Sequence, residues 1–340
     1  MSKKNSNVLN LKSLVLGNKK TSNLYSIFKK NLKPLNKKKS FIVGVSGGPD
    51  SLSLSALMKI FSIETKAKVF YVLIDHGIRK DSSKEAVKVK KLLKKHKISL
   101  VVLKNEEKIN KNIQAKAREI RYKLLLNFSK KKRAKYILTA HHSDDQIETF
   151  FIRLSRGSGV QGLSSMKTIT KLDKNITLIR PLLEFKKKDL ILLAKKSFGK
   201  IFKDPSNYDS KYLRTRIRLL RENLDKTGIH HDQIIRSIKN LASANETLNN
   251  YINKISKNNI SIRKKEIKIN FENISKETLE IQLRILSGAI KKFAKSYYPP
   301  RSKKIKNVIN ILNLNNQKKL TLAGCLIQKS GKYLSIKKEA

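Results

Sequence analysis

FIVGVSGGPDS, which spans Phe41 to Ser51, is the stretch that decides the fold. Its first five residues form an unbroken apolar run, which is typical of a buried strand, and a helical pattern from Leu52 to Phe61 follows at once. Two glycines between a strand and a helix let the backbone turn tightly and present successive N–H groups, which is the geometry of an anion cradle. The segment therefore predicts a phosphate-binding loop at the end of a strand.

The polar groups of this loop suit a nucleotide. Ser46 and Ser51 supply hydroxyl donors, and Asp50 supplies a carboxylate that could hold Mg²⁺ against phosphate oxygens. The stretch matches neither the GxxxxGK[ST] loop of kinase-like NTPases nor the GxGxxG loop of dinucleotide-binding folds. A plain helix N-cap with glycine as a hinge is the alternative interpretation. The predicted loop consists of Ser46, Gly47, Gly48, Pro49, Asp50 and Ser51.

Short apolar runs alternate with helical patterns from Phe41 to Leu154. This alternation predicts an α/β fold with a doubly wound, mostly parallel sheet and helices on both faces. Ligands of such sheets bind beyond the carboxyl ends of the strands. Polar clusters stand at those places, at 46–51, 75–79 and 141–148.

The pattern divides the chain into three predicted parts. Residues 1–38 are Lys-rich with weak periodicity, so we expect a loose basic arm with one short helix around Ser22 to Lys30. Residues 39–226 form the predicted α/β domain. Residues 227–340 carry long helical patterns and a closing alternation with a turn near 330–331, which predicts a smaller helical domain that ends in a β-hairpin.

The charge balance is extreme, with 77 Lys and Arg against 25 Asp and Glu and a formal net charge of +52. A polyanionic partner such as nucleic acid is one explanation. The other is compositional bias, because Lys, Asn and Ile are all abundant, as an AT-rich genome would impose. The 39% hydrophobic content excludes wholesale disorder.

The cysteine count and the lack of a long apolar run exclude further classes of protein. The single cysteine, Cys325, rules out an internal disulfide, a four-cysteine zinc site, an iron–sulfur cluster and CxxC redox chemistry carried by this chain alone. The sequence has no apolar run of about 18 residues, so we expect no membrane association and a cytoplasmic protein.

An acidic cluster, Asp144, Asp145 and Glu148, follows the strand that ends at Ala140, in a chain otherwise poor in acids. Acids in a first helical turn are favoured by the helix dipole, which is the simplest interpretation. Spacings of three and four residues place these carboxylates on one face, where their repulsion calls for a cation such as Mg²⁺ or an ammonium group. Zinc held by His141 and His142 is a weaker alternative, because no third spaced ligand exists.

Arginines cluster later in the chain. Arg214, Arg218 and Arg221 share one face of a predicted helix, and guanidinium forks suit phosphates and carboxylates. A solvated basic face is the alternative. The use of Arg where composition favours Lys indicates fixed binding groups.

Five segments together resemble the N-type ATP pyrophosphatases and, within them, the tRNA(Ile)-lysidine synthetase family. The loop has that class's SGGxDS mark. The other segments, in the family's order, are IDHGIR at 74–79, HHSDDQIETFFIRLSRGSGVQGLSSM at 141–166, RPLL at 180–183 and DPSNYDSKYLRTRIR at 204–218. The resemblance covers residues 40–222, and KLTLAGCLI near the end is similar to the family's first C-terminal domain.

This resemblance implies an adenine nucleotide alpha hydrolase-like fold and a defined ligase reaction. ATP adenylates the carbonyl oxygen on carbon 2 of the wobble cytidine of tRNA(Ile) with anticodon CAU and releases pyrophosphate. The ε-amine of free lysine then displaces AMP to give lysidine, which converts codon specificity from AUG to AUA and identity from methionine to isoleucine. Residues 39–226 would be the catalytic domain and 227–340 the tRNA-binding domain, with oligomeric state open and a homodimer among the options.

Residue roles follow from the same resemblance. The loop would hold the leaving phosphates, with Asp50 on Mg²⁺, and the segment from Ile74 to Gly77, which includes His76, would line the adenine. Arg118 and Arg121 would stabilise the α-phosphate. Asp145 and Glu148 would bind the ammonium group of the lysine substrate, with Asp145 as a candidate base, and Arg214 or a neighbour would meet its carboxylate. The predicted catalytic residues are Asp50, Arg121 and Asp145.

Two departures and two alternatives accompany this interpretation. Thr215 stands where the family usually has asparagine. Longer members have a further C-terminal domain, so we expect tRNA recognition to rest on a shorter architecture. The alternatives are another N-type ATP pyrophosphatase, such as a tRNA thiolation enzyme, for which one cysteine is too few, and a non-catalytic basic RNA-binding protein, against which the retained acids argue.

Overall fold

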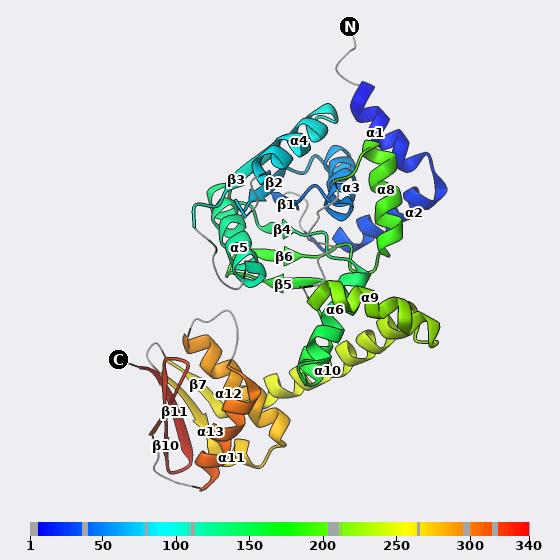
Figure 1. Ribbon diagram of the computed structural model, residues 1–340. Helices are drawn as coiled ribbons and strands as arrows, with labels where there is room; N and C mark the ends of the chain where they lie inside the picture. The colour runs from blue at the N-terminus through cyan, green and yellow to red at the C-terminus, as the bar shows by residue number, and fades with distance from the viewer. Residues whose placement is uncertain are drawn as a thin grey trace. The chain divides into compact units, whose positions relative to one another are not determined.

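The computed structural model describes residues 6–35, 40–78, 81–107, 109, 113–202, 211, 213–263, 266–294, 300–314 and 319–339. The chain divides into two compact units, Met1–Lys239 and Asn240–Ala340 (Figure 1). The division falls within helix α10 (His231–Asn259). Arg79, Asp204 to Asn207 and Tyr212, which the sequence patterns singled out, lie outside the described residues.

The first unit is built on a six-stranded sheet in the order β3-β2-β1-β4-β6-β5. Its pairs are parallel except for β5 with β6, which are antiparallel. The predicted doubly wound, mostly parallel sheet is therefore confirmed. The strands are β1 (Phe41–Val45), β2 (Val69–Asp75), β3 (Leu100–Lys104), β4 (Tyr136–Leu138), β5 (Ile169–Lys171) and β6 (Thr177–Ile179).

Helices cover both faces of this sheet. Side chains alternate along a strand, so Phe41 and Val43 of β1 join one apolar cluster while Ile42 joins the other. Because β1 is buried on both faces, its sequence is a continuous apolar run. One face holds α3 (Pro49–Thr65), α4 (Ser82–Lys95) and α8 (Lys187–Phe198), and the other holds α5 (Ile113–Lys131).

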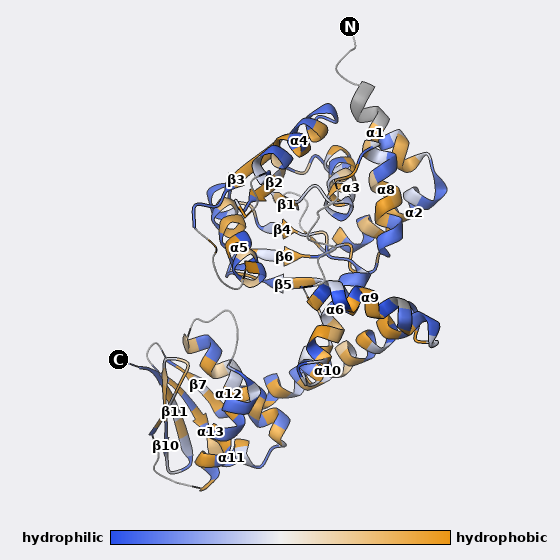
Figure 2. Cartoon of the chain, in the orientation of Figure 1, coloured by the Kyte–Doolittle hydropathy of each residue, from blue (hydrophilic) through white to orange (hydrophobic). Residues whose placement is uncertain are grey.

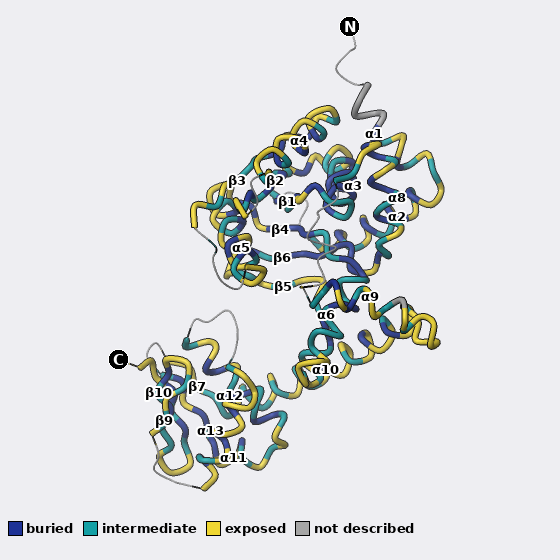
Figure 3. Tube along the Cα trace, viewed as in Figure 1, coloured by how far each residue is buried: buried dark blue, intermediate teal, exposed yellow. Residues whose placement is uncertain are grey.

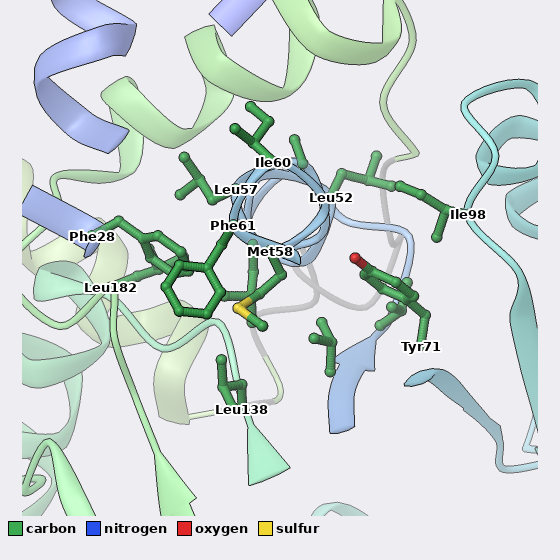
Figure 4. Packing of buried hydrophobic residues seen from close by; sticks show 14 of the residues in the cluster. Phe28, Leu52, Leu57, Met58, Ile60, Phe61, Tyr71, Ile98, Leu138 and Leu182 are labelled. Atoms are coloured by element: carbon green, nitrogen blue, oxygen red, sulfur yellow. The ribbon is translucent and has the colours of Figure 1, made fainter. Parts of the chain in front are cut away.

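Helix α3 lies at the centre of the larger core. Leu57 and Met58 are fully buried, and burying a side chain of this size contributes about 1.5–3 kcal/mol. The helix that begins in the glycine loop is therefore firmly anchored. Figure 4 shows the packing around it, with labels on Phe28, Leu52, Leu57, Met58, Ile60, Phe61, Tyr71, Ile98, Leu138 and Leu182.

The N-terminal region differs from the expected loose arm with one short helix. Two helices, α1 (Ser6–Leu16) and α2 (Lys19–Leu32), contribute fully buried Leu11, Phe28 and Leu32 to the core of α3. Lys29 of α2 also pairs with Glu64 of α3 at 2.8 Å. Helix α2 contains the expected short helix, whereas α1 was missed because its apolar residues are spread around the helix and form no clear stripe.

Three further helices belong to the first unit, and α10 begins there. They are α6 (Ser143–Leu154), α7 (Val160–Leu163) and α9 (Leu213–Lys226). The surface helices α4 and α5 have both hydrophilic and hydrophobic residues (Figure 2), whereas the central strands are buried (Figure 3). None of the helices described here combines the length and apolar character that a membrane crossing requires.

The second unit combines helices with a five-stranded antiparallel sheet, in the order β7-β8-β11-β10-β9. The expected hairpin is present as β10 and β11, which turn at 330–333, but the other three strands were not expected. Strands β7 and β9 are only three and four residues long, too short to show a period of two clearly. The elements are β7 (Ile260–Ile262), β8 (Glu266–Asn270), α11 (Phe271–Ser275), α12 (Leu279–Ala294), α13 (Ser302–Leu314), β9 (Lys319–Leu322), β10 (Cys325–Ser330) and β11 (Tyr333–Lys338).

Candidate active site

A cavity of about 670 Å³ lies at the carboxyl ends of β1, β2 and β4 in the first unit. Its wall combines the glycine loop with residues of α4, α5, α6, α8 and α9. The location is the one that an open parallel sheet provides for a ligand. The residues predicted from sequence that line it are Ser46, Gly48, Pro49, Asp50, Ser51, Ile74, Arg118, Arg121, Asp145 and Arg214.

The glycine loop has a backbone conformation that requires glycine at position 47. Gly47 has φ +86°, and an added Cβ would lie 2.6 Å from Cγ2 of Val89, so a larger residue there is both strained and obstructed. Gly48 is the N-cap of α3, and Pro49 starts the helix where its missing N–H costs nothing. Ser51 Oγ donates to the carbonyl of Gly48 at 3.0 Å and accepts from the Ser46 N–H at 3.1 Å. This leaves an ordered turn at the positive end of a helix dipole, which favours phosphate.

Among the described residues, four arginine side chains line the cavity: Arg118, Arg121, Arg214 and Arg218. Burial lowers the pKa of Arg121, and the nearby Arg118 and Arg214 lower it further. His141, which also lines the cavity, has a pKa well below its usual value because of burial and these same arginines. The imidazole is therefore neutral, and the cavity is a concentrated positive site that suits a polyanion.

Arg118 is held by an aromatic neighbour. Its guanidinium lies 5.1 Å from the ring centre of Tyr122, and Nη2 donates to the Tyr122 hydroxyl at 3.3 Å. Tyr122 is buried against the sheet, so the contact fixes the arginine at the cavity wall.

A buried histidine connects the acidic cluster to the glycine loop. His142 Nε2 lies 3.5 Å from Asp50 Oδ2 and 3.6 Å from Asp145 Oδ2, and its Nδ1 lies 3.6 Å from Asp144 Oδ2. Burial alone would lower its pKa, but these carboxylates raise the pKa of His142 to about 10. Because Nδ1 accepts from the backbone N–H of Asp144 at 3.2 Å, the ring carries its hydrogen on Nε2, which faces Asp50 and Asp145.

Two carboxylates of the acidic cluster form ion pairs with arginines of α9. Glu148, only 1% exposed, accepts from Arg218 Nε at 2.5 Å and Nη2 at 3.3 Å, and Arg221 pairs with Asp144. Burial opposes ionisation of Asp144, yet His142 and Arg221 hold its pKa well below the usual range. The repulsion within the acidic cluster is therefore relieved by groups of the chain itself.

Only one member of the cluster reaches the cavity. Asp145 lines it, whereas Glu148 and Asp144 stand behind the wall. Asp145 Oδ2 also accepts from the backbone N–H of His142 at 3.0 Å, which closes the first turn of α6. Asp145 is thus placed to meet a ligand, and Glu148 instead holds Arg218 at the cavity.

His76 lies beside the cavity without lining it. Both ring nitrogens are buried and have no hydrogen-bond partner among the described residues. Burial and the charge of Arg121 lower the pKa of His76 to about 4. A neutral imidazole with unused donor and acceptor groups fits contact with a heterocycle better than contact with phosphate.

A magnesium ion fits the loop carboxylate. Asp50 Oδ1 is buried and lacks a hydrogen-bond partner within the described part of the chain, so an acceptor oxygen is available there. Mg²⁺ typically takes one or two protein carboxylates together with substrate phosphates and water, so a single loop carboxylate fits it.

Two charged residues of this site were not identified from the sequence, Glu85 of α4 and Lys187 of α8, which line the cavity. His142 was considered only as a zinc ligand, whereas in the structure it lies between the acids and the loop. Thr215, the departure from the family pattern, is buried and lines the cavity too. The order of motifs along the chain does not reveal which side chains pair across 70 or more residues, as Glu148 and Arg218 do.

The PP-loop domain family matches residues 19–223. The U34-tRNA thiolase NcsA from Methanococcus maripaludis, solved with its 4Fe-4S cluster, shares the fold with a TM-score of 0.55. The two chains are 20% identical, and the match covers 66% of this chain and 80% of that one. Fold, loop and cavity together define a PP-loop ATP pyrophosphatase domain, a class that uses ATP.

Closer relatives narrow this class. The tRNA(Ile)-lysidine synthase of Wolbachia pipientis wMel is 36% identical over 303 residues, which are 88% of this chain and 70% of that protein. The tRNA(Ile)-lysidine synthase of Orientia tsutsugamushi (strain Boryong) is 33% identical over 314 residues, covering 87% of this chain and 69% of that protein. The chain belongs to the tRNA(Ile)-lysidine synthase family and is an enzyme of the ligase class.

Proposed function

We propose that the protein joins lysine to carbon 2 of the wobble cytidine of tRNA(Ile) with anticodon CAU, through an adenylated tRNA intermediate. The observation that carries this proposal is one cavity that combines a phosphate-binding loop and four arginines with the carboxylate of Asp145. A polyanion and an ammonium group need opposite charges, and both are present in the same wall.

The phosphate end of the cavity supports adenylation. The N–H groups of the loop and the start of α3 bind the β- and γ-phosphates, and Arg118 and Arg121 stabilise charge on the α-phosphate as the cytidine oxygen attacks it. Pyrophosphate leaves from the loop. Asp50 would hold Mg²⁺, which supplies charge neutralisation when it is bound. The adenine is assigned to the end where Ile74 lines the cavity and His76 lies beside it.

The other end supports lysine transfer. Asp145 binds the ε-ammonium group and accepts its proton, because an amine attacks only with a free lone pair. Arg214 and Arg218 meet the lysine carboxylate, and Glu148 fixes Arg218. The amine nitrogen then bonds to carbon 2 of the base as AMP departs, which restores the ring and yields lysidine.

Two competing functions meet specific objections. The thiolase with the shared fold carries a 4Fe-4S cluster, and such clusters are held mainly by cysteine thiolates. This chain has one cysteine, Cys325, which is buried in the core of the second unit. A non-catalytic RNA-binding protein has no need for Asp50, Asp145 and a neutral His141 around one cavity.

The test is incorporation of labelled lysine into a tRNA(Ile) transcript in the presence of ATP. We expect one AMP and one pyrophosphate for each lysine added, and no incorporation when the wobble cytidine is replaced by uridine. Asp50→Ala should lower the rate by about 10³-fold or more. Asp173→Asn, at an exposed acid paired with Lys130, is the matched control and should behave as wild type. Transfer of sulfur, or no transfer, would refute the proposal.

A further inference from the structure

Asp144 is the member of the acidic cluster that the proposed reaction does not use. It stands in the first turn of α6, behind the cavity wall. An acid there would ordinarily be explained by the helix dipole alone. Its carboxylate, however, also contacts the helices α8 and α9, which points to an additional role.

The carboxylate of Asp144 joins three helices. Arg221 of α9 donates to Oδ1, and the backbone N–H of Lys187, at the start of α8, donates to Oδ2 at 3.1 Å. The backbone N–H of Asp144, held in place by these contacts, donates to Nδ1 of His142 at 3.2 Å, and Oδ2 lies 3.6 Å from the same nitrogen. The Asp144 side chain is 14% exposed and that of His142 is 4% exposed, so the set is shielded from solvent.

The other edge of the His142 ring faces the glycine loop. Nε2 lies 3.5 Å from Oδ2 of Asp50, at the cavity wall. Arg221, Asp144, His142 and Asp50 therefore form one continuous chain from α9 to the loop. A buried ring held at both edges has little freedom to rotate, and the loop carboxylate beside it is constrained in turn.

We propose that Asp144 is a positioning residue for the nucleotide site, which with Arg221 fixes His142 and thereby the carboxylate of Asp50. The inference rests on the proposed function, because it assumes that Asp50 acts on the Mg²⁺ form of the nucleotide. Asp144 itself touches neither nucleotide nor lysine. Its effect on the site is transmitted through the imidazole.

The experiment measures binding of a non-hydrolysable ATP analogue to the full chain by calorimetry, across a series of Mg²⁺ concentrations, without lysine or tRNA. Asp144→Asn keeps the shape of the side chain and removes its charge. We expect the Mg²⁺ concentration for half-maximal binding to rise about tenfold, as for loss of a hydrogen bond to a charged group, with binding in EDTA unchanged. Asp173→Asn should shift nothing.

A double-mutant cycle separates positioning from a general structural role. If Asp144 acts through Asp50, the Asp50→Asn, Asp144→Asn double variant shifts no further than Asp50→Asn alone. Additive shifts, or a wild-type Mg²⁺ dependence of Asp144→Asn, would overturn the positioning role only. If Asp50→Asn leaves the Mg²⁺ dependence unchanged, the magnesium assignment fails and the positioning role falls with it.

Thermal melting by circular dichroism checks that each variant is folded. Should Asp144→Asn be unfolded at the assay temperature, Arg221→Lys tests the same chain of contacts, because lysine keeps the charge and loses the fork. We expect a smaller shift in the same direction. An unshifted Arg221→Lys, with Asp144→Asn unfolded, would reduce Asp144 to a structural clamp.

Discussion

The two walls of the cavity are built in different ways. The loop wall consists of backbone turned at Gly47 and anchored by the buried helix α3. The α6–α9 wall consists of side-chain ion pairs between residues far apart in sequence, such as Glu148 with Arg218 and Asp144 with Arg221. The first kind of wall depends on local conformation, and the second depends on folded charge pairing. Substitutions in the loop wall and in the α6–α9 wall should therefore affect different properties of the protein.

Removing Glu148 tests the α6–α9 wall most severely. Glu148→Ala leaves Arg218 without its bidentate partner beside the buried start of α6, and breaking such a pair costs about 3–5 kcal/mol. We expect the free energy of unfolding in urea to fall by about that amount.

A matched double variant shows whether the cost comes from removing the Glu148 carboxylate beside Arg218. Glu148→Ala with Arg218→Met should recover part of the stability, because the guanidinium that lost its bidentate acceptor is gone. A double variant less stable than Glu148→Ala would contradict the buried-pair account.

The loop wall should lose nucleotide binding rather than stability. Gly47→Ala places a Cβ 2.6 Å from Val89 at φ +86°, so the loop must shift away from its cradle. We expect ATP-analogue binding to weaken about 100-fold, which corresponds to roughly 2.7 kcal/mol. Gly157→Ala is the control, because Gly157 also has positive φ but nothing within 4 Å of an added Cβ. Equal effects of the two substitutions would argue against a cradle at Gly47.

Single arginines of α9 should affect lysine more than ATP. Arg214→Ala removes a cavity-lining guanidinium, and we expect the KM for lysine to rise about tenfold with little change in ATP-analogue binding. Arg216→Ala, two residues away and exposed, should leave both quantities unchanged. A rise in the KM for ATP instead would assign Arg214 to the phosphate end.

The smallest expected effect is the loss, at acidic pH, of the stability that Asp144 contributes. The folded-state pKa of Asp144 is depressed, so its stabilising contribution is present above its unfolded value of about 3.8 and is lost as pH falls through the folded value. The difference in unfolding free energy between wild type and Asp144→Asn should be constant from pH 7 to about 4 and shrink below that. Urea titrations at each pH measure it. A difference that grows on acidification would contradict the depressed pKa.

Sequence patterns predicted the loop wall well and the α6–α9 wall incompletely. The loop lies within one strand–turn–helix unit, so Ser46 to Ser51 were identifiable from local order, and the parallel sheet followed from alternation. The acids were identified as needing a cation, but Arg218 and Arg221 supply it in the structure. Such pairings form only when α9 packs on α6, and the spacing of residues along the sequence does not reveal that packing. Helix α1 was missed because its apolar residues form no clear stripe, and strands β7 and β9 were missed because three or four residues show no clear period of two.

A crystal structure of the protein with a non-hydrolysable ATP analogue, Mg²⁺ and lysine would show both substrate sites at once. We expect the triphosphate on 46–51 and the lysine ε-ammonium at Asp145, both within the cavity at the carboxyl ends of β1, β2 and β4. Lysine bound away from Asp145, or phosphates bound away from the loop, would contradict this expectation.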